Sequence, residues 1–492
     1  MTGETHERRS WRRLVVVGVA VVLGASLLAA DPRPATGRSF PPPTPAADCG
    51  PGAREETDIQ GRVPQADYES GRVEKGYRCN TRPVAGHGST GGFKVQRYRD
   101  DDGRVCAFYD STLLFPKDTL MNPAEGIGVV VLDMTDPRKP RQTAMLTTPA
   151  MESPHESLLL NRRRGLLAAT LGNAATNVGV LDVYDVRDDC REPRLLSSTP
   201  VALLGHESGW SRDGLTFWAA STAGQTLVAL DLTDPATPVP VFEQAGVNYH
   251  GLRLSRDGRT MYVANIGTEA NGAFASGGLR ILDVSEVQER HPTPAVPVLA
   301  DLTWPEMSIP QVAEPFRRGG RDYLLEVDEF ANYSTDAGAD QSGAPVGAAR
   351  IVDVTHPRRP RVVSHLRLAV HQPAARRGEQ QDDPGAQSPV QGYAAHYCSV
   401  PRYRNPKAVA CSMIASGLRL FDIRRLDAPR EVGYFNTPVR PGSQPENPEA
   451  EGGYAMAQPA WDLRRRSVWY SDGHTGFHVV RLTNGTGRLL RR

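Results

Sequence analysis

Four histidines recur at corresponding places in this chain, and their side chains are the first candidates for chemistry. They stand in the segments SPHES, LGHES, NYHGL and AAHYC, as His155, His206, His250 and His396. Eleven residues after each of the first three, an apolar run begins. Neutral imidazole is a good ligand for transition metals. If the fold gathers these segments, the sequence predicts one bound ion of Cu, Zn, Fe or Mn.

Acidic residues near these positions extend the candidate site. A later repeat carries VAEPF, where Ala313 or Glu314 replaces the histidine, so Glu314 is a candidate fifth ligand. Other side chains are candidates for a ligand-binding face or for orienting a ring nitrogen. They are His87 of VAGHG, Glu156 and Glu207, which directly follow two of the histidines, and Asp328 and Glu329, which begin a long insertion.

Apolar runs that end in Asp give the architecture that must position these side chains. GVVVLD, NVGVLD, TLVALD, GLRILD, ARIVD and GLRLFD end at Asp133, Asp182, Asp231, Asp283, Asp353 and Asp422, and a weaker copy covers 476–485. Such short runs of Val, Ile and Leu are typical of strands buried on both faces. Flanking runs supply three further strands per copy. The chain is therefore predicted to be all-β, a seven-bladed β-propeller of four-stranded antiparallel blades.

The repeat strands resemble those of the LVIVD-repeat family of bacterial extracytoplasmic propellers. The pattern G-(V/L)-x-(V/I/L)-(L/V/F)-D carries this resemblance over roughly 78–483, and SRDGRTMYVAN also resembles the YVTN-type repeat. The resemblance implies the propeller fold. It implies little about function, because that family is largely uncharacterised and a fold does not define an activity.

Closure of the ring is predicted from the two ends of the repeat region. The tail GTGRLLRR is too polar for an outer strand, whereas YRCNTRPVAGH matches the outer-strand pattern. We expect Arg78–Val84 to form the outer strand of blade seven.

Long insertions and the histidines are expected at one face. The insertions 266–278, 330–348, 371–392 and 438–453 fall on connections at the face where the innermost strands begin. Insertions on one face commonly form the binding face of a repeat protein. Their carboxylates are solvated loop charges or a site for calcium or another cation.

A structural role for the histidines is the alternative to metal binding. In WD-type propellers a His that follows Gly bonds an Asp and locks the blade, and Gly205-His206 resembles that arrangement. Each of the four histidines precedes a repeat Asp by 25–33 residues, so recurrence does not separate the two hypotheses. Some propeller enzymes hold a metal on an axial His or carboxylate cluster. Nitrogens around a shared point indicate a metal, whereas imidazoles bonded to the repeat Asp residues indicate a structural role.

The N-terminus predicts export. Four arginines precede the uncharged run 14–30, so 1–30 is expected to be a signal peptide, or else an uncleaved membrane anchor. A Pro-rich linker and N-terminal extension follow at 31–77, and the propeller occupies 78–492. The six cysteines suit disulfides in an exported chain. Cys398 and Cys411 flank a strand–turn–strand segment and are predicted to pair, while the pairing of the other four stays open.

Two functions follow from these features. The net charge of +1 gives no general attraction to nucleic acid. The first prediction is a monomeric binding or scaffold protein, secreted or on the extracytoplasmic face of a bacterial membrane. Its loop face would bind an extracellular protein, a glycan or a small ligand, and only an N-terminal anchor would touch the membrane. The second is a metal-dependent hydrolase, lyase or oxidoreductase, whose metal activates water or polarises a substrate. No catalytic residue is assigned.

Overall fold

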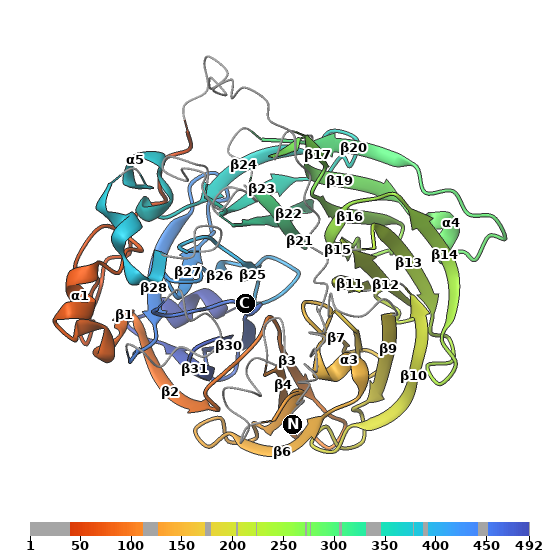
Figure 1. The fold of residues 1–492 in the computed structure, drawn as a ribbon, viewed down its shortest axis with the longest axis horizontal. Helices are drawn as coiled ribbons and strands as arrows, with labels where there is room; N and C mark the ends of the chain where they lie inside the picture. Colours follow the sequence, from red (N-terminus) through yellow and green to blue (C-terminus); the bar gives the residue numbers. More distant parts are fainter. Residues whose placement is uncertain are drawn as a thin grey trace, which may run out of the picture. The chain divides into compact units, whose positions relative to one another are not determined.

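Seven antiparallel sheets stand around a central axis in the computed structural model (Figure 1). The structure describes residues 40–111, 126–172, 179–202, 205–222, 224–270, 273–275, 277–304, 308–330, 346–376, 378–386, 392–440 and 451–491. The predicted all-β, seven-bladed propeller is confirmed. Residues 1–30 lie outside the described residues, so the signal peptide or anchor stays a prediction.

Blades one to four follow each other along the chain. Blade one contains β3 (Val95–Arg99), β4 (Val105–Asp110), β5 (Val129–Asp133) and β6 (Arg141–Leu146). Blade two contains β7 (Leu159–Asn161), β8 (Leu166–Thr170), β9 (Gly179–Asp185) and β10 (Arg194–Ala202). Blade three contains β11 (Glu207–Trp210), β12 (Thr216–Ser221), β13 (Thr226–Asp231) and β14 (Val239–Ala245). Blade four contains β15 (Tyr249–Leu254), β16 (Thr260–Asn265), β19 (Gly278–Asp283) and β20 (Val298–Leu302). A small hairpin, β17 (Thr268–Ala270) and β18 (Ala273–Ala275), interrupts it.

Blades five to seven complete the ring. Blade five contains β21 (Ile309–Arg318), β22 (Arg321–Glu329), β23 (Ala349–Asp353) and β24 (Arg361–Leu366). Blade six contains β25 (Tyr397–Ser399), β26 (Ala408–Ser412), β27 (Leu418–Asp422) and β28 (Arg430–Asn436). Blade seven contains β29 (Ala460–Asp462), β30 (Ser467–Asp472) and β31 (Gly476–Leu482). The first strand of each blade lies nearest the axis and the fourth at the rim (Figure 1).

The ring is closed by an N-terminal strand, as predicted, but with shifted bounds. β2 (Thr81–His87) pairs with β31 as the outer strand of blade seven. β1 (Tyr77–Cys79) instead pairs with β28 as a fifth strand of blade six. Asn80 separates the two strands with a φ of +52°, a left-handed conformation that Asn adopts more readily than most residues. Arg78 therefore belongs to blade six rather than to the closing strand.

The repeat strand is the third strand of each blade and is almost wholly buried. Its terminal Asp accepts a hydrogen bond from the backbone N–H two residues later, as at Asp231 and Thr233. In blade two this place belongs to Asp185, which pairs across from Leu166 and binds the N–H of Arg187. Asp182, expected here from the sequence, lies earlier in the strand and is buried. The expectation was wrong because the run GVLDVYD contains two Asp residues.

The helices are short, and none of them lies among the inner strands. They are α1 (Gln65–Glu69), η1 (Arg72–Lys75), α3 (Pro149–Glu152), α4 (Ser285–Gln288), η2 (Ala369–His371), α5 (Pro373–Arg376), η3 (Glu379–Asp382), η4 (Pro384–Ala386) and η5 (Thr486–Leu490). Residues 40–76, which include α1, lie along the rim beside β1 and β28 (Figure 1). Glu56 and Glu431 pair there with the buried Arg419. In the described part of the chain, no helix has the length and apolarity needed to cross a membrane.

All six cysteines form disulfides. Cys398 and Cys411 face each other in β25 and β26 and are bonded, which is the pairing expected from the sequence. The sequence did not determine the other two bonds, because they join distant segments: Cys49–Cys79 and Cys106–Cys190.

Candidate metal centre

One residue from each blade lies at an equivalent place where the innermost strand begins. The strand pairings identify them. In each blade, one residue of the second strand pairs with the terminal Asp of the repeat strand, or with Arg481 in blade seven. Five residues before the inner-strand position opposite that same residue lie Phe93, Glu156, His206, His250, Gln311, His396 and Ala457. The sequence identified three of them as the recurring histidines. In blade two the equivalent residue is Glu156, with His155 one place before it. In blade five it is Gln311 and not Glu314, because β21 and β22 pair for longer than the other inner hairpins, as far as Arg318 and Arg321.

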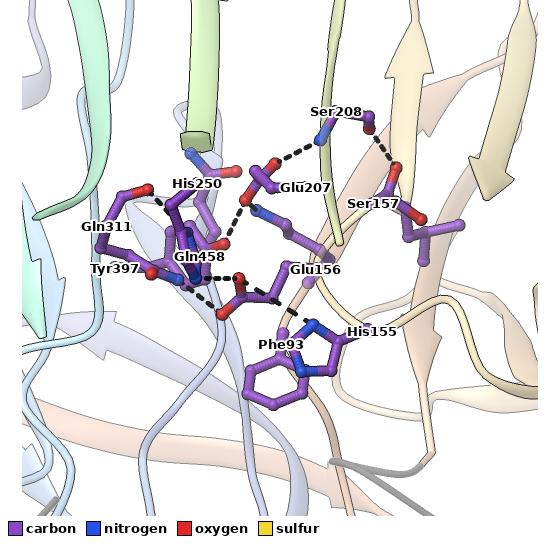
Figure 2. A network of polar contacts seen from close by, with 12 residues as sticks. Phe93, His155, Glu156, Ser157, Glu207, Ser208, His250, Gln311, Tyr397 and Gln458 are labelled. Carbon is purple, nitrogen blue, oxygen red and sulfur yellow. Dashed lines mark hydrogen bonds and ion pairs between the residues drawn. The ribbon is translucent and has the colours of Figure 1, made fainter. Parts of the chain in front are cut away.

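The four predicted histidines come together at the axis. The ring centroids of His155 and His206 are 4.3 Å apart, as are those of His206 and His250. His396 approaches from blade six, and the Phe93 ring lies between it and His155, 5.2 and 4.6 Å from their rings. Figure 2 shows the Glu156 side chain extending toward this centre beside His155 and Phe93.

Two carboxylates complete what we term the axial cluster, defined as His155, Glu156, His206, His250, Glu329 and His396. Nε2 of His396 lies 3.0 Å from Oε1 of Glu156 and 3.2 Å from Oε2 of Glu329. Nε2 of His250 lies 3.4 Å from an oxygen of each of the same carboxylates. Nε2 of His206 lies 3.3 Å from Oε2 of Glu156.

Within two triads of this cluster, the spacings allow the ligand atoms to share one metal ion. Ligand atoms that are each about 2.1 Å from a metal lie about 3.0–3.4 Å from one another in octahedral or tetrahedral arrangements. Two triads have all their ligand atoms within 4.8 Å of each other. One is His155, Glu156 and His206, and the other is Glu156, Glu329 and His396. The donor set of imidazoles and carboxylates suits a first-row transition metal.

Hydrogen bonds on the outer side of the rings turn Nε2 toward the centre. Nδ1 of His250 lies 3.1 Å from the carbonyl oxygen of Gln311, and Nδ1 of His396 lies 2.8 Å from that of Met456. A carbonyl oxygen only accepts, so Nδ1 carries the proton in both rings. Nδ1 of His206 lies 2.9 Å from the hydroxyl of Thr222. Such bonds fix the tautomer and the orientation of metal-binding histidines.

The hydrogen bond of His250 depends on a glycine. A Cβ atom at Gly251 would lie 2.2 Å from the carbonyl oxygen of Gln311, the same atom that accepts from His250. The inner strands of blades four and five can approach this closely only because residue 251 has no side chain.

Buried polar atoms at the centre lack partners among the described residues. They are Nδ1 of His155 and Oε1 of Gln311. Buried polar groups are nearly always satisfied, and exceptions point to an ion or water at the site. His155 also has a φ of +48°, and backbone strain of this kind concentrates at functional sites.

The electrostatic environment favours neutral rings around an ionised carboxylate. Burial, reinforced by His206, holds the pKa of His155 well below its usual range. Burial also lowers the pKa of His250, although Glu156 opposes this effect. Burial alone would raise the pKa of Glu156, but His250 and the bonds from His206 and His396 outweigh it and hold that pKa well below its usual value. Neutral imidazole and ionised carboxylate are the forms that bind metals.

His396 differs from the other rings. Burial opposes its charged form, but the hydrogen bonds with Glu156 and Glu329 outweigh burial and raise its pKa to about 9. With Nδ1 committed to Met456, its Nε2 faces two carboxylates and must carry either a proton or a metal there.

The structural alternative fails on the positions of the repeat Asp residues. None of the four histidines bonds to Asp182, Asp231, Asp283 or Asp422 among the described residues. Their carboxylates instead bind Ala150 N–H, Arg290, Ser285 and Arg424, respectively.

Three of the other sequence candidates lie outside the axial cluster, as does Glu314. Glu314 pairs with Arg253 at 3.0 Å. Asp328 is buried against the indole N–H of Trp304 and the guanidinium of Arg350. His87 lies on the outer strand β2, with Nδ1 3.1 Å from the hydroxyl of Tyr109.

Glu207 lies in a buried charged layer adjacent to the axial cluster. Its carboxylate binds Nζ of Lys94 at 2.8 Å, Arg253 at 3.3 Å and the hydroxyl of Tyr397. Lys94, Arg253 and Tyr397 of this layer were not identified from the sequence. Phe93 and Gln311, which occupy the equivalent strand-start positions of blades one and five, were also missed. In the sequence, these residues differ from their neighbours only in their position along the inner strands. That position can be assigned only when the pairing register of the strands is known.

Access to the axial cluster is greatest beside His206. The side chain of His206 is 24% exposed, whereas that of His396 is 1% exposed. Within the cluster, His206 is therefore the side chain with the greatest contact with solvent.

No family model matches the chain, and no curated protein matches it, so membership of the LVIVD-repeat family stays a prediction. Solved structures show distant likenesses. The β-propeller domain of Myceliophteria thermophila Cps50 (Swd1) is 11% identical over 81% of this chain and 98% of that chain, with a TM-score of 0.48. A protein of unknown function from Desulfotomaculum acetoxidans is 12% identical over 74% of this chain and 89% of that chain, with a TM-score of 0.44. The fold assignment here rests on the strand pairings of the chain itself.

Proposed function

We propose that this protein is a metal-dependent enzyme whose single transition-metal ion is held by the axial cluster. The observation that carries the proposal is the convergence of Nε2 of His206, His250 and His396 on Glu156. Hydrogen bonds on the opposite ring nitrogens hold this arrangement. Ring-specific orientation of this kind is a recurrent property of metal-binding histidines.

Catalysis, rather than a purely structural metal, is supported by the partial exposure of His206, the most exposed side chain of the cluster. A structural site is closed by protein ligands, whereas a catalytic site keeps a position open for water or substrate. The partial exposure of His206 provides such an approach. The identity of the metal decides between hydrolytic or lyase chemistry, which suits Zn, and redox chemistry, which suits Cu, Fe or Mn.

Metal analysis of the purified protein tests this function. We expect about one equivalent of Cu, Zn, Fe or Mn, lost in the double variant His206→Ala/His250→Ala. His291→Ala is the control, because His291 is half exposed beside Glu286 and Glu289, away from the axis. Azide added to the loaded protein should perturb the spectrum of a Cu or Fe centre, or of Co²⁺ substituted for Zn. A metal-free protein refutes the site, and a metal that azide cannot reach refutes catalysis.

The scaffold function predicted from the sequence stays a second proposal for the same face. Two of the four long loops on which it depends, 330–348 and 438–453, lie largely outside the described residues. The three disulfides are typical of proteins in an oxidising compartment. They support the proposal that the protein acts outside the cytoplasm.

A further inference from the structure

A second cavity lies on the axis, at the opposite end of the inner strands from the histidines. Its volume is about 720 Å³, and all seven inner strands contribute to its wall. Strand β15 connects the two sites, because it carries His250 of the axial cluster and, three residues later, Arg253, which lines the cavity. The charged layer around Glu207 separates this lower cavity from the axial cluster.

The lower cavity has an excess of positive charge. Six arginines line it, against two carboxylates, Glu314 and Asp462. Glu314 is already engaged by Arg253 at 3.0 Å. Asp462 is the only carboxylate left for the remaining arginines, and it lies 3.8 Å from Arg97 and 3.7 Å from Arg465. These contacts are long for ion pairs and leave most of the positive charge uncompensated.

Two arginines have capacity for a ligand. Nε of Arg97 is buried without a hydrogen-bond partner among the described residues. Arg162 is exposed within the cavity, and no carboxylate of the described residues lies within 4 Å of it; its Nε donates to the carbonyl of Arg97 at 3.2 Å. The like charges of Arg97 and Arg162 repel each other across this contact, so an anion beside the pair relieves their mutual repulsion. Guanidinium groups bind carboxylate and phosphate in a bidentate manner.

Aromatic side chains stand between these charges. Trp210 and Trp461 both line the cavity, and each uses its indole N–H within the protein, toward Leu159 and Ser399. Both rings are only partly buried, so the part that lines the cavity is apolar surface for the carbon skeleton of a ligand. This combination suits an organic anion better than a bare ion.

We propose that the lower cavity binds a small organic anion carrying carboxylate or phosphate groups, held by Arg97 and Arg162. This site is independent of the metal proposed at the axial cluster and of any catalysis there. The shared chemistry is an oxyanion on a small molecule.

Isothermal titration with citrate and with glycerol 3-phosphate, in buffer containing salt, distinguishes the two anion types. We expect saturable one-to-one binding of at least one of them, weakened tenfold or more by Arg162→Gln. Arg259→Gln is the matched control, since Arg259 is an exposed arginine paired with Glu289, outside the cavity. Arg97→Gln should weaken binding in the same way and provides a second variant.

Three results overturn the proposal. The first is no saturable binding of either anion up to about 10 mM. The second is unchanged binding in both Arg162→Gln and Arg97→Gln. The third is equal weakening by Arg259→Gln, which means diffuse surface charge rather than a site.

Discussion

Nε2 of His396 in blade six lies 3.0 Å from Oε1 of Glu156 in blade two. The opposite nitrogen of His396 donates to the carbonyl of Met456. Two inner strands that belong to different blades thus present an anchored imidazole and a carboxylate to the same point on the axis. This relationship is the basis of the metal-site proposal, because Glu156 also faces His206 and His250.

Glu156 should be needed for metal binding, and Glu314 should not. Glu156→Gln removes the carboxylate shared by three imidazoles, and we expect metal content to fall to about a tenth of wild type or less. Glu314→Gln alters the pair with Arg253 and the hydrogen bond accepted from Gln458, both outside the axial cluster, and should retain the metal. Metal analysis of both variants checks the prediction. Equal loss from the two would indicate a general effect on folding.

Gly251→Ala should damage the site through the backbone. The new Cβ meets the carbonyl oxygen of Gln311, which must move away from Nδ1 of His250. We expect a loss of about 1–3 kcal/mol in the free energy of unfolding from overpacking, and a metal affinity about 10–100-fold lower. Gly378→Ala is the control, since its nearest contact is an ordinary 3.4 Å. A metal affinity unchanged in Gly251→Ala would show that the orientation of His250 does not matter.

Much of this site was predictable from the sequence, but its detailed membership was not. The repeat strands fixed the blade number, and the spacing of His206, His250 and His396 correctly placed them at equivalent strand starts. The misassigned ligand Glu314 lies three residues past Gln311, because strand lengths do not appear in a residue count. Glu329 stands at the end of β22, the second strand of blade five. The repeat of the inner strands therefore gave no indication that Glu329 contacts His250 and His396.

Asp110 should make stability depend on pH. It is buried and accepts hydrogen bonds from the N–H groups of Phe93 and Lys94 at 2.7 and 2.9 Å. Burial raises its pKa to about 7, although these hydrogen bonds and the charge of Lys94 oppose the effect. Between pH 4 and 7 the native state therefore holds a proton that the unfolded state has lost. The contribution of this carboxyl to stability falls as the pH rises through that window, by at most about 1.4 kcal/mol per pH unit.

Urea unfolding of wild type and Asp110→Asn at pH 5 and pH 7 measures this effect. We expect the stability of wild type relative to the variant to be lower at pH 7 by about 1–2 kcal/mol. A difference that does not change with pH would mean that Asp110 does not titrate in this range.

The two buried disulfides of the propeller should differ in their effect on stability. Cys106–Cys190 joins blades one and two across 84 residues, whereas Cys398–Cys411 joins neighbouring strands across 13. The entropy lost by the unfolded chain grows with loop length, so replacing the longer bridge by two alanines should cost about 1.5 kcal/mol more. Denaturant midpoints of the two double variants provide the comparison, and the reverse order would contradict the chain-entropy explanation.

The most direct measurement is an anomalous-scattering map from a crystal of the natively purified protein, collected at the absorption edge of the metal it contains. We predict one peak on the propeller axis, about 2.0–2.2 Å from an oxygen of Glu156 and from the ligand atoms of one of the two triads, either His155 and His206 or His396 and Glu329. A map with no peak among these residues, in crystals that diffract well enough to show one, would contradict the account of this protein as a metal enzyme.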